Sequence, residues 1–337
     1  MNVKIYDVWG SNFLEFVNEV KNDIPDLIIM NYIFEGYNSY ADSDIDIEFY
    51  NFTNKHNIPV KILSVVPDTN DRSSFQNVEF IYWETFWFYR TFKLWNHKHH
   101  NEFNLTKGVD INDLYQFNDQ ELNIPFICLN NRYKFHRCTV LDMLAKYNLI
   151  EKGAVSWLGK LYNAQIADDT YHYKYWDPKI LVLDQTPDEK FSQETMPIEF
   201  NSSFVQLVTE TLDYVNFITE KTTTPILLNK LFLVAGGVGQ HKKLYDLGFK
   251  LYEELFDYSF DTEQDIEVRY DKLIQNINRY ISSDYTKLYK SVFPKVVENK
   301  RLAIEYAKVI PKNVLHIYNT LIKNNPDYDG QLNILRN

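Results

Sequence analysis

One stretch of the sequence combines a carboxylate, a helix start with a lysine and a glycine turn, in an order that suits phosphate binding. An apolar segment that we expect to be a buried strand begins near residue 204 and ends at Glu210, and a second one, residues 231–235, ends in a glycine pair. Alternating strands and helices indicate a parallel sheet, and ligands of such sheets bind at the carboxyl ends of the strands. The residues expected at that edge are Glu210, Thr219, Glu220, Lys221, Gly236 and Gly237.

These residues suit the binding of a nucleoside diphosphate. The N-terminus of a helix offers free N–H groups and partial positive charge to a phosphate, and Lys221 adds a full cation at the helix start. Glu220 is placed where a carboxylate can accept hydrogen bonds from the two hydroxyls of a ribose. The alternative interpretation is an ordinary surface Glu–Lys pair at a helix start, with Pro225 just inside the helix.

A similar order of strand, polar residues and helix occurs earlier and contributes an arginine. Residues 124–129 are predicted to form a buried strand and residues 138–147 an amphipathic helix, and between them lie Asn131 and Arg137, both candidates for binding the diphosphate. An arginine in this place can bind a phosphate through two parallel hydrogen bonds. It can equally well solvate the helix start or form a salt bridge to Asp142, and the sequence leaves both interpretations open.

The first third of the chain has the pattern of a separate α/β domain. Residues 27–30, 60–66 and 78–83 are apolar runs typical of buried strands, and residues 12–21 form an amphipathic helical pattern. Glu35 and Glu84 each follow one of these strands, so each is a candidate for a general base that deprotonates a hydroxyl, or else ordinary surface charge. We expect domains at 1–118 and 119–337, with the boundary in the polar stretch 107–122.

Acidic residues alternate with isoleucines between positions 42 and 48. Carboxylates spaced in this way can hold a divalent metal over a diphosphate, but they also describe the polar face of an edge strand, which we favour. The histidine-rich run at 97–100 is interpreted as a polar loop, because adjacent histidines point apart. The alternating acidic residues are Asp42, Asp44, Asp46 and Glu48.

Composition excludes several classes of protein. The 337 residues are enough for two domains with a sizeable core, and the net charge of -11 disfavours a broad nucleic-acid footprint. Two cysteines are too few for a disulfide framework or a zinc site, so we expect a reducing compartment, the cytoplasm. No segment has the apolar length of a membrane span or the pattern of a signal peptide. The many aromatic residues are expected mainly in the core.

Two segments of the chain together resemble the donor site of fucosyltransferase-type glycosyltransferases of the GT-B fold. That family carries a Phe-Glu-Asn segment, followed by Tyr-(Val/Ile)-Thr-Glu-Lys at the start of a helix. This chain has Val-Thr-Glu-Thr at 208–211 and Phe-Ile-Thr-Glu-Lys at 217–221, and the apolar strand and glycine turn at 231–237 follow in the family's order. Arg137 resembles the family's arginine that meets the donor diphosphate. The resemblance covers roughly residues 124–280.

The resemblance implies an α/β protein with two Rossmann-like domains facing a cleft. The C-terminal domain would bind a nucleotide-diphosphate sugar, used as a co-substrate with no other cofactor, and the late helices would pack back toward the first domain. It implies an inverting, metal-independent transferase that acts on a hydroxyl acceptor. The second half is also similar to phage and giant-virus proteins of this class, which would place the protein in the host cytoplasm.

The chain departs from the family at Thr211, where the family has Asn, and at Phe217, where it has Tyr. The resemblance therefore carries over to Glu220, Lys221 and Arg137, but not to the identity of the sugar. Three alternatives remain at this stage. The first is a transferase of the same class whose acceptor is a modified DNA base and not a glycan. The second is a non-catalytic nucleotide- or glycan-binding protein on a transferase fold. The third is a metal-dependent GT-A enzyme that uses the acidic cluster at 42–46.

Overall fold

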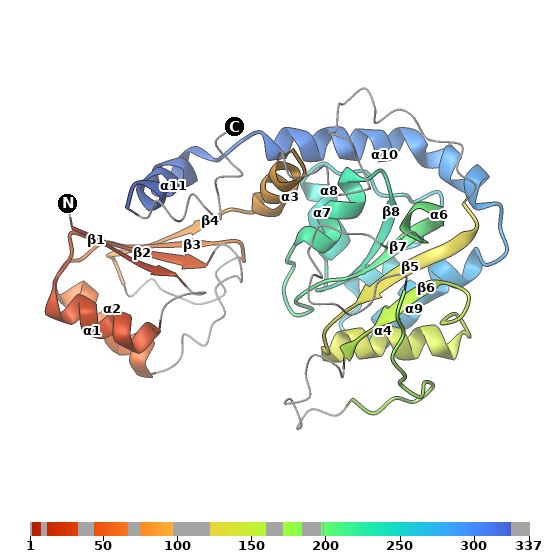
Figure 1. Ribbon diagram of the computed structural model, residues 1–337, viewed down its shortest axis with the longest axis horizontal. Coiled ribbons are helices and arrows are strands. Elements are labelled where there is room, and N and C mark those ends of the chain that lie inside the picture. Colours follow the sequence, from red (N-terminus) through yellow and green to blue (C-terminus); the bar gives the residue numbers. More distant parts are fainter. Residues whose placement is uncertain are drawn as a thin grey trace. The chain divides into compact units, whose positions relative to one another are not determined.

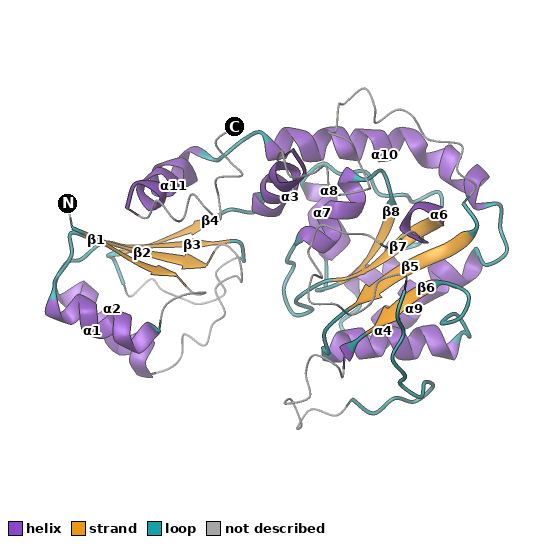
Figure 2. Ribbon diagram, viewed as in Figure 1, coloured by secondary structure: helices purple, strands orange, loops and turns teal. Residues whose placement is uncertain are grey.

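The computed structural model describes residues 2–7, 12–32, 44–66, 75–96, 122–159, 171–183, 197 and 199–324 (Figure 1). The chain divides into two compact units, Met1–Lys93 with Ala307–Asn337, and Leu94–Tyr306. Each unit has its own parallel sheet with helices, as Figure 2 shows, so the predicted α/β class with two Rossmann-like sheets is confirmed. The predicted boundary in 107–122 falls almost entirely outside the described residues and stays a prediction, whereas the last helix is grouped with the first unit.

The first unit contains a sheet of four parallel strands in the order β1-β2-β3-β4. Helices α1 and α2 cover one face of this sheet, and α11 lies on the other side (Figure 1). The central strand β2 is buried along its whole length, because β1 and β3 flank it and helices cover both faces of the sheet. The elements are β1 (Val3–Asp7), α1 (Phe13–Asn22), β2 (Leu27–Tyr32), α2 (Asp44–Lys55), β3 (Val60–Ser64), β4 (Val78–Tyr82), α3 (Phe86–Asn96) and α11 (Lys312–Asn324).

The expected edge strand over residues 42–48 is wrong, because residues from Asp44 onward belong to helix α2. The alternation of acids and isoleucines lasts only a few residues, and the aromatic residues that follow it decide the structure. Phe49 and Tyr50 are buried while Ile47 is 47% exposed, which is a helical pattern of burial. Glu48 forms an ion pair with Lys21 of α1, at 2.6 Å.

The second unit contains a sheet of four parallel strands in the order β6-β5-β7-β8. Helices α4 and α9 pack side by side along it (Figure 2). One isolated antiparallel bridge links Trp157 to Leu181. The elements are β5 (Ile124–Asn130), α4 (Phe135–Lys146), β6 (Ala154–Trp157), α6 (Glu199–Ser202), β7 (Ser203–Thr209), α7 (Glu220–Leu227), β8 (Leu231–Ala235), α8 (Gln240–Asp246), η3 (Tyr258–Thr262), α9 (Ile266–Arg279) and α10 (Tyr285–Ala307).

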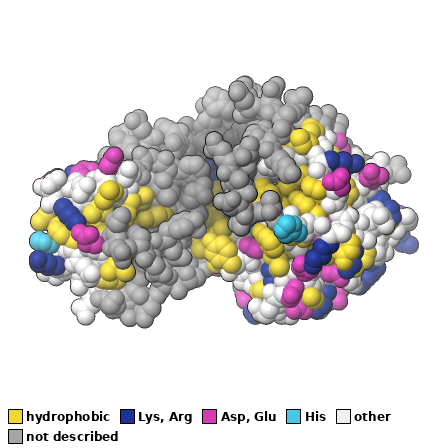
Figure 3. Space-filling model, turned by 90° about the horizontal axis from the view of Figure 1, so that it is seen from below, with side chains coloured by type: hydrophobic (Ala, Val, Ile, Leu, Met, Phe, Trp, Pro, Cys, Tyr) yellow, Lys and Arg dark blue, Asp and Glu magenta, His cyan; other side chains and the backbone are white. Residues whose placement is uncertain are grey.

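In the described part of the chain, no helix combines the length and the apolar character needed to cross a membrane. On the face of the second unit that Figure 3 shows, acidic and basic side chains are interspersed. Many of them form ion pairs, such as Lys146 with Asp271 and Lys174 with Glu267.

Candidate functional site

The strand order of the second unit places a topological switch point between β5 and β7. From β5 the chain passes through α4 to β6 on one side, whereas β7 and β8 extend the sheet on the other side. In open α/β sheets, ligands bind beyond the carboxyl ends of the strands at such a point. Asn131 directly follows β5 and Glu210 directly follows β7, so both predicted binding residues lie at the switch point.

Glu210 is fully buried, and its carboxylate is bonded on all sides by the protein. Its Oε1 accepts hydrogen bonds from the backbone N–H of Thr219, at 3.0 Å, and from the hydroxyl of Thr222, at 2.5 Å. Its Oε2 accepts from the hydroxyl of Thr219, at 2.6 Å, and from the backbone N–H of Thr211, at 3.1 Å. The carboxylate therefore closes the loop 211–218 and fixes the start of α7.

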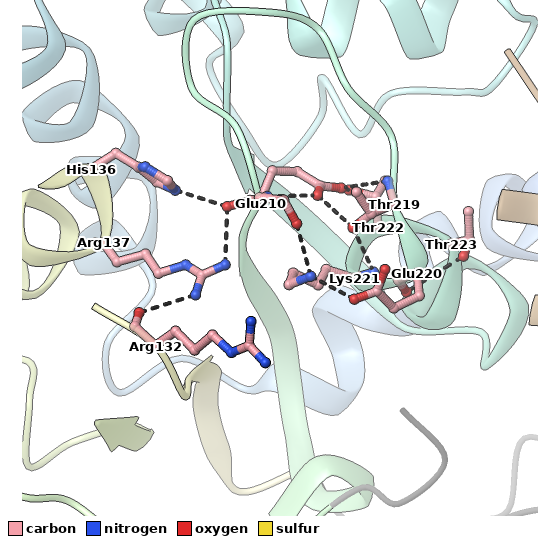
Figure 4. A network of polar contacts seen from close by, with 10 residues as sticks. Arg132, His136, Arg137, Glu210, Thr219, Glu220, Lys221, Thr222 and Thr223 are labelled. Atoms are coloured by element: carbon pink, nitrogen blue, oxygen red, sulfur yellow. Dashed lines mark hydrogen bonds and ion pairs between the residues drawn. The ribbon is translucent and has the colours of Figure 1, made fainter. Parts of the chain in front are cut away.

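The backbone carbonyl of Glu210 holds the first turn of α4 (Figure 4). It accepts hydrogen bonds from Nε2 of His136, at 2.8 Å, and from a terminal nitrogen of Arg137, at 3.3 Å. Because a carbonyl oxygen only accepts, the Nε2 atom of His136 carries the proton. The other terminal nitrogen of Arg137 donates to the carbonyl of Arg132, at 3.1 Å, while its buried Nε has no partner.

Lys221 lies at the mouth of α7 and is partly exposed. Thr219 caps this helix, because its side chain accepts a hydrogen bond from the backbone N–H of Lys221. The Lys221 ammonium group donates to Thr211 at 3.0 Å and to the carboxylate of Glu220 at 2.5 Å (Figure 4). The predicted helix start is thus confirmed, and so is the Glu–Lys pair, in which the Lys221 side chain is 31% exposed and the Glu220 side chain 16%.

Burial shifts the protonation equilibria of the two α4 side chains. It lowers the pKa of His136 to about 4, although the Asp213 carboxylate, 3.7 Å from Nδ1, acts in the opposite direction. His136 is therefore neutral at pH 7. Burial also lowers the pKa of Arg137, and the negative charges of Glu210 and Glu220 oppose this shift. The Arg137 guanidinium thus lies within electrostatic reach of both carboxylates.

The glycine turn after β8 packs against the loop 211–218. A Cβ atom on Gly237 would lie 2.7 Å from the carbonyl carbon of Val215 and 2.8 Å from the side-chain oxygen of Asn216, so only glycine permits this contact. The carbonyl of Gly236 accepts a hydrogen bond from the hydroxyl of Tyr270, at 3.4 Å. The structure thus gives both glycines packing partners, and their predicted contact with a phosphate stays a prediction.

The other predicted residues are distributed over both units. Asn131 lies beside the exposed Arg132, and its side-chain oxygen is buried without a hydrogen-bond partner. Glu84 belongs to the first unit, where the hydroxyl of Tyr82 donates to its carboxylate at 3.5 Å. Glu35 lies outside the described residues.

Sequence reasoning missed two side chains that organise the site, His136 and Thr222. His136 stands next to Arg137, but a histidine at a helix start carries no distinctive signal, and Thr222 is one of three consecutive threonines. The alternative salt bridge from Arg137 to Asp142 is wrong. Asp142 accepts the backbone N–H groups of residues 174–176 instead, at 2.8–3.0 Å.

Within the described ranges, no group of three or more His, Cys, Asp or Glu residues is arranged to hold a metal ion. The run 97–100, Asp42, and the side chains of Asp44 and Asp46 lie outside what the structure describes.

No family model matches the chain, and neither a curated protein nor a solved structure matches it. The class that the structure defines is an α/β protein with two separate parallel sheets, Rossmann-like in each unit. Any function must therefore be argued from the geometry at the switch point.

Proposed function

We propose that this protein is an inverting glycosyltransferase that binds a nucleoside diphosphate sugar at the carboxyl ends of β5 and β7. The observation that carries the proposal is the buried Arg137, whose Nε has no partner, held at the switch point by the Glu210 carbonyl. A buried N–H group without a partner is costly and calls for an acceptor. A phosphate oxygen is a suitable acceptor, since guanidinium groups bind phosphate through charge-assisted hydrogen bonds.

The charges around Arg137 support a diphosphate as the ligand. Arg132 is exposed and its charge acts on Arg137, and Lys221 adds a further cation from the opposite helix. Glu220 now neutralises Lys221 at 2.5 Å. On binding, the ammonium would exchange this carboxylate for a phosphate oxygen, and the Glu220 carboxylate would accept hydrogen bonds from ribose hydroxyls.

The proposed reaction needs stabilisation of the leaving group and removal of one proton. The bond between the sugar's anomeric carbon and the phosphate oxygen breaks, and its electron pair leaves with the nucleoside diphosphate. Arg137 and Lys221 stabilise this growing negative charge, the role a metal ion has in other transferases. The acceptor oxygen forms the new bond on the opposite face, and its proton passes to a carboxylate, for which Glu84 and Glu35 are the candidates.

Calorimetric titration with GDP, UDP, CMP and inorganic pyrophosphate tests the binding step. Release of free sugar from nucleotide sugars, measured with and without EDTA, tests the chemistry. We expect tighter binding of one nucleoside diphosphate than of pyrophosphate, and activity that survives EDTA. Binding without any sugar release or transfer would favour the non-catalytic binding protein. Activity lost in EDTA and restored by manganese would favour the metal-dependent alternative.

The acceptor is tested with two substrates, an oligosaccharide mixture and hydroxymethylated duplex DNA. Both offer a hydroxyl group, and transfer of a radiolabelled sugar to one of them identifies the acceptor class. The net charge of -11 and the interspersed charges on the face shown in Figure 3 favour the glycan, because a DNA-binding surface concentrates lysine and arginine.

A further inference from the structure

We infer that Glu210 is a positioning residue that holds the two proposed phosphate-binding side chains in register, and that its carboxylate does not itself bind the nucleotide. The inference deepens the proposed function and rests on it for the identity of the ligand. It replaces the expectation, drawn from the sequence, that Glu210 is a direct binding residue.

The hydrogen-bonding capacity of the Glu210 carboxylate is filled within the protein. A carboxylate offers about four lone-pair sites, and the four donors from residues 211, 219 and 222 fill those of Glu210. Glu210 is also 0% exposed. A ribose or phosphate could reach this group only by displacing hydrogen bonds from the protein, whereas the side chains of Glu220 and Lys221 are partly exposed, at 16% and 31%.

Glu210 connects the two helices that carry the proposed phosphate-binding cations. The backbone carbonyl of Glu210 holds His136 and Arg137 of α4, and the side chain of the same residue holds the first turn of α7, which carries Lys221. These two helices belong to different crossovers of the sheet. Glu210 therefore links the positions of the two cations, and loss of its carboxylate releases α7 while leaving the carbonyl in place.

Small displacements of the start of α7 would change the position of Lys221. Positioning errors of about 1 Å can lower catalytic rates by about a hundredfold, because phosphate contacts depend on geometry. A Glu210→Gln variant keeps the shape of the side chain but turns one acceptor oxygen into an amide that faces donors such as the Thr211 N–H. We expect this variant to hold the start of α7, and with it Lys221, less firmly, although no group that is proposed to touch the ligand has been removed.

Thr222 offers a cleaner perturbation than Glu210 itself. Its hydroxyl donates to the Glu210 carboxylate at 2.5 Å, so this hydroxyl is already used within the protein and is not proposed to contact the ligand. Thr222→Val removes the hydroxyl and keeps the shape, whereas Thr222→Ser keeps the hydroxyl. If Glu210 acts by positioning, the valine variant loses affinity for the nucleoside diphosphate and for pyrophosphate, by about tenfold, and the serine variant retains it.

Asp142→Asn is the matched control. Asp142 is also a fully buried carboxylate of the second unit, but it anchors residues 174–176 and makes no contact with α7 in the described structure. Titration of pyrophosphate and nucleoside diphosphates is combined with amide hydrogen exchange over residues 211–224 and 171–177. We expect Glu210→Gln and Thr222→Val to speed exchange in 211–224 and Asp142→Asn to do so in 171–177.

The outcomes separate the inference from the proposed function. A wild-type protein that binds none of the probes contradicts the proposed function, and hydrogen exchange still decides whether Glu210 holds α7. Unchanged affinity in Glu210→Gln, or equal losses in Thr222→Val and Thr222→Ser, contradicts the positioning role. Equal affinity losses in Thr222→Val and Asp142→Asn would also contradict it, since a general loss of stability would then explain both.

Discussion

Replacing Lys221 by alanine distinguishes the diphosphate site from an ordinary surface ion pair. A charge-assisted hydrogen bond to phosphate contributes about 1.5–3 kcal/mol. In the free protein, however, the ammonium already contacts Glu220 at 2.5 Å and Thr211 at 3.0 Å, and those contacts must be exchanged for the ligand. The net loss therefore lies toward the lower end of this range, which corresponds to about a tenfold weaker affinity. Calorimetric titration of the nucleoside diphosphate that the wild-type protein binds measures it.

Stability and catalysis provide the second half of this test. The Lys221 side chain is 31% exposed, so its ion pair contributes less than about 1 kcal/mol to folding, and the fold should survive. Sugar transfer should fall at least as far as affinity, since the charge on the leaving group grows toward the transition state.

Lys250→Ala is the control for this substitution, because Lys250 pairs with Glu298 in the same unit and is 45% exposed. It removes the same charge without touching the site. Equal dissociation constants for wild type and Lys221→Ala, in a protein that binds the nucleotide, would refute the assignment of the diphosphate site.

Three further predictions follow from the same geometry. Glu220→Gln should raise the affinity for pyrophosphate, because Lys221 loses its competing carboxylate, and it should reduce the preference for a nucleoside diphosphate over pyrophosphate. Parallel titrations with the two ligands measure both effects. A lower affinity for pyrophosphate in the variant would contradict the prediction. The pKa of His136 is about 6.5 in the unfolded chain and about 4 in the folded protein, so between these pH values the unfolded chain binds more protons. The free energy of unfolding therefore falls as the pH drops through this window, by about 1.4 kcal/mol per pH unit. Urea unfolding at several pH values should show a shallower pH dependence for His136→Gln than for the wild type. Gly237→Ala should cost about 1–3 kcal/mol of stability, because its Cβ would meet the Val215 backbone at 2.7 Å, and an unchanged unfolding midpoint would contradict this contact.

The sequence by itself determined the elements and the edge at which they present polar residues. The strand at 231–235, the strand ending just before Glu210, and the start of α7 capped by Thr219 all stand where apolar runs and capping chemistry predict them. These features are local, because burial of a short apolar run and satisfaction of a helix end depend on neighbours in the chain. Local pattern failed at Asp44, where an alternation of a few residues predicted a strand and burial of Phe49 and Tyr50 produced a helix.

The tertiary structure alone decided what each polar residue contacts. Glu210 and Glu220 were both expected at the carboxyl edge of the sheet, yet Glu210 is fully buried, whereas Glu220 pairs with Lys221 at the start of α7. His136 acquires its role only because the strand order brings β7 beside β5, which places the Glu210 carbonyl 2.8 Å from its ring. Hydrogen bonds between residues more than seventy positions apart depend on that order. The spacing of residues within one segment does not predict these hydrogen bonds, because they depend on how α4 packs against the end of β7.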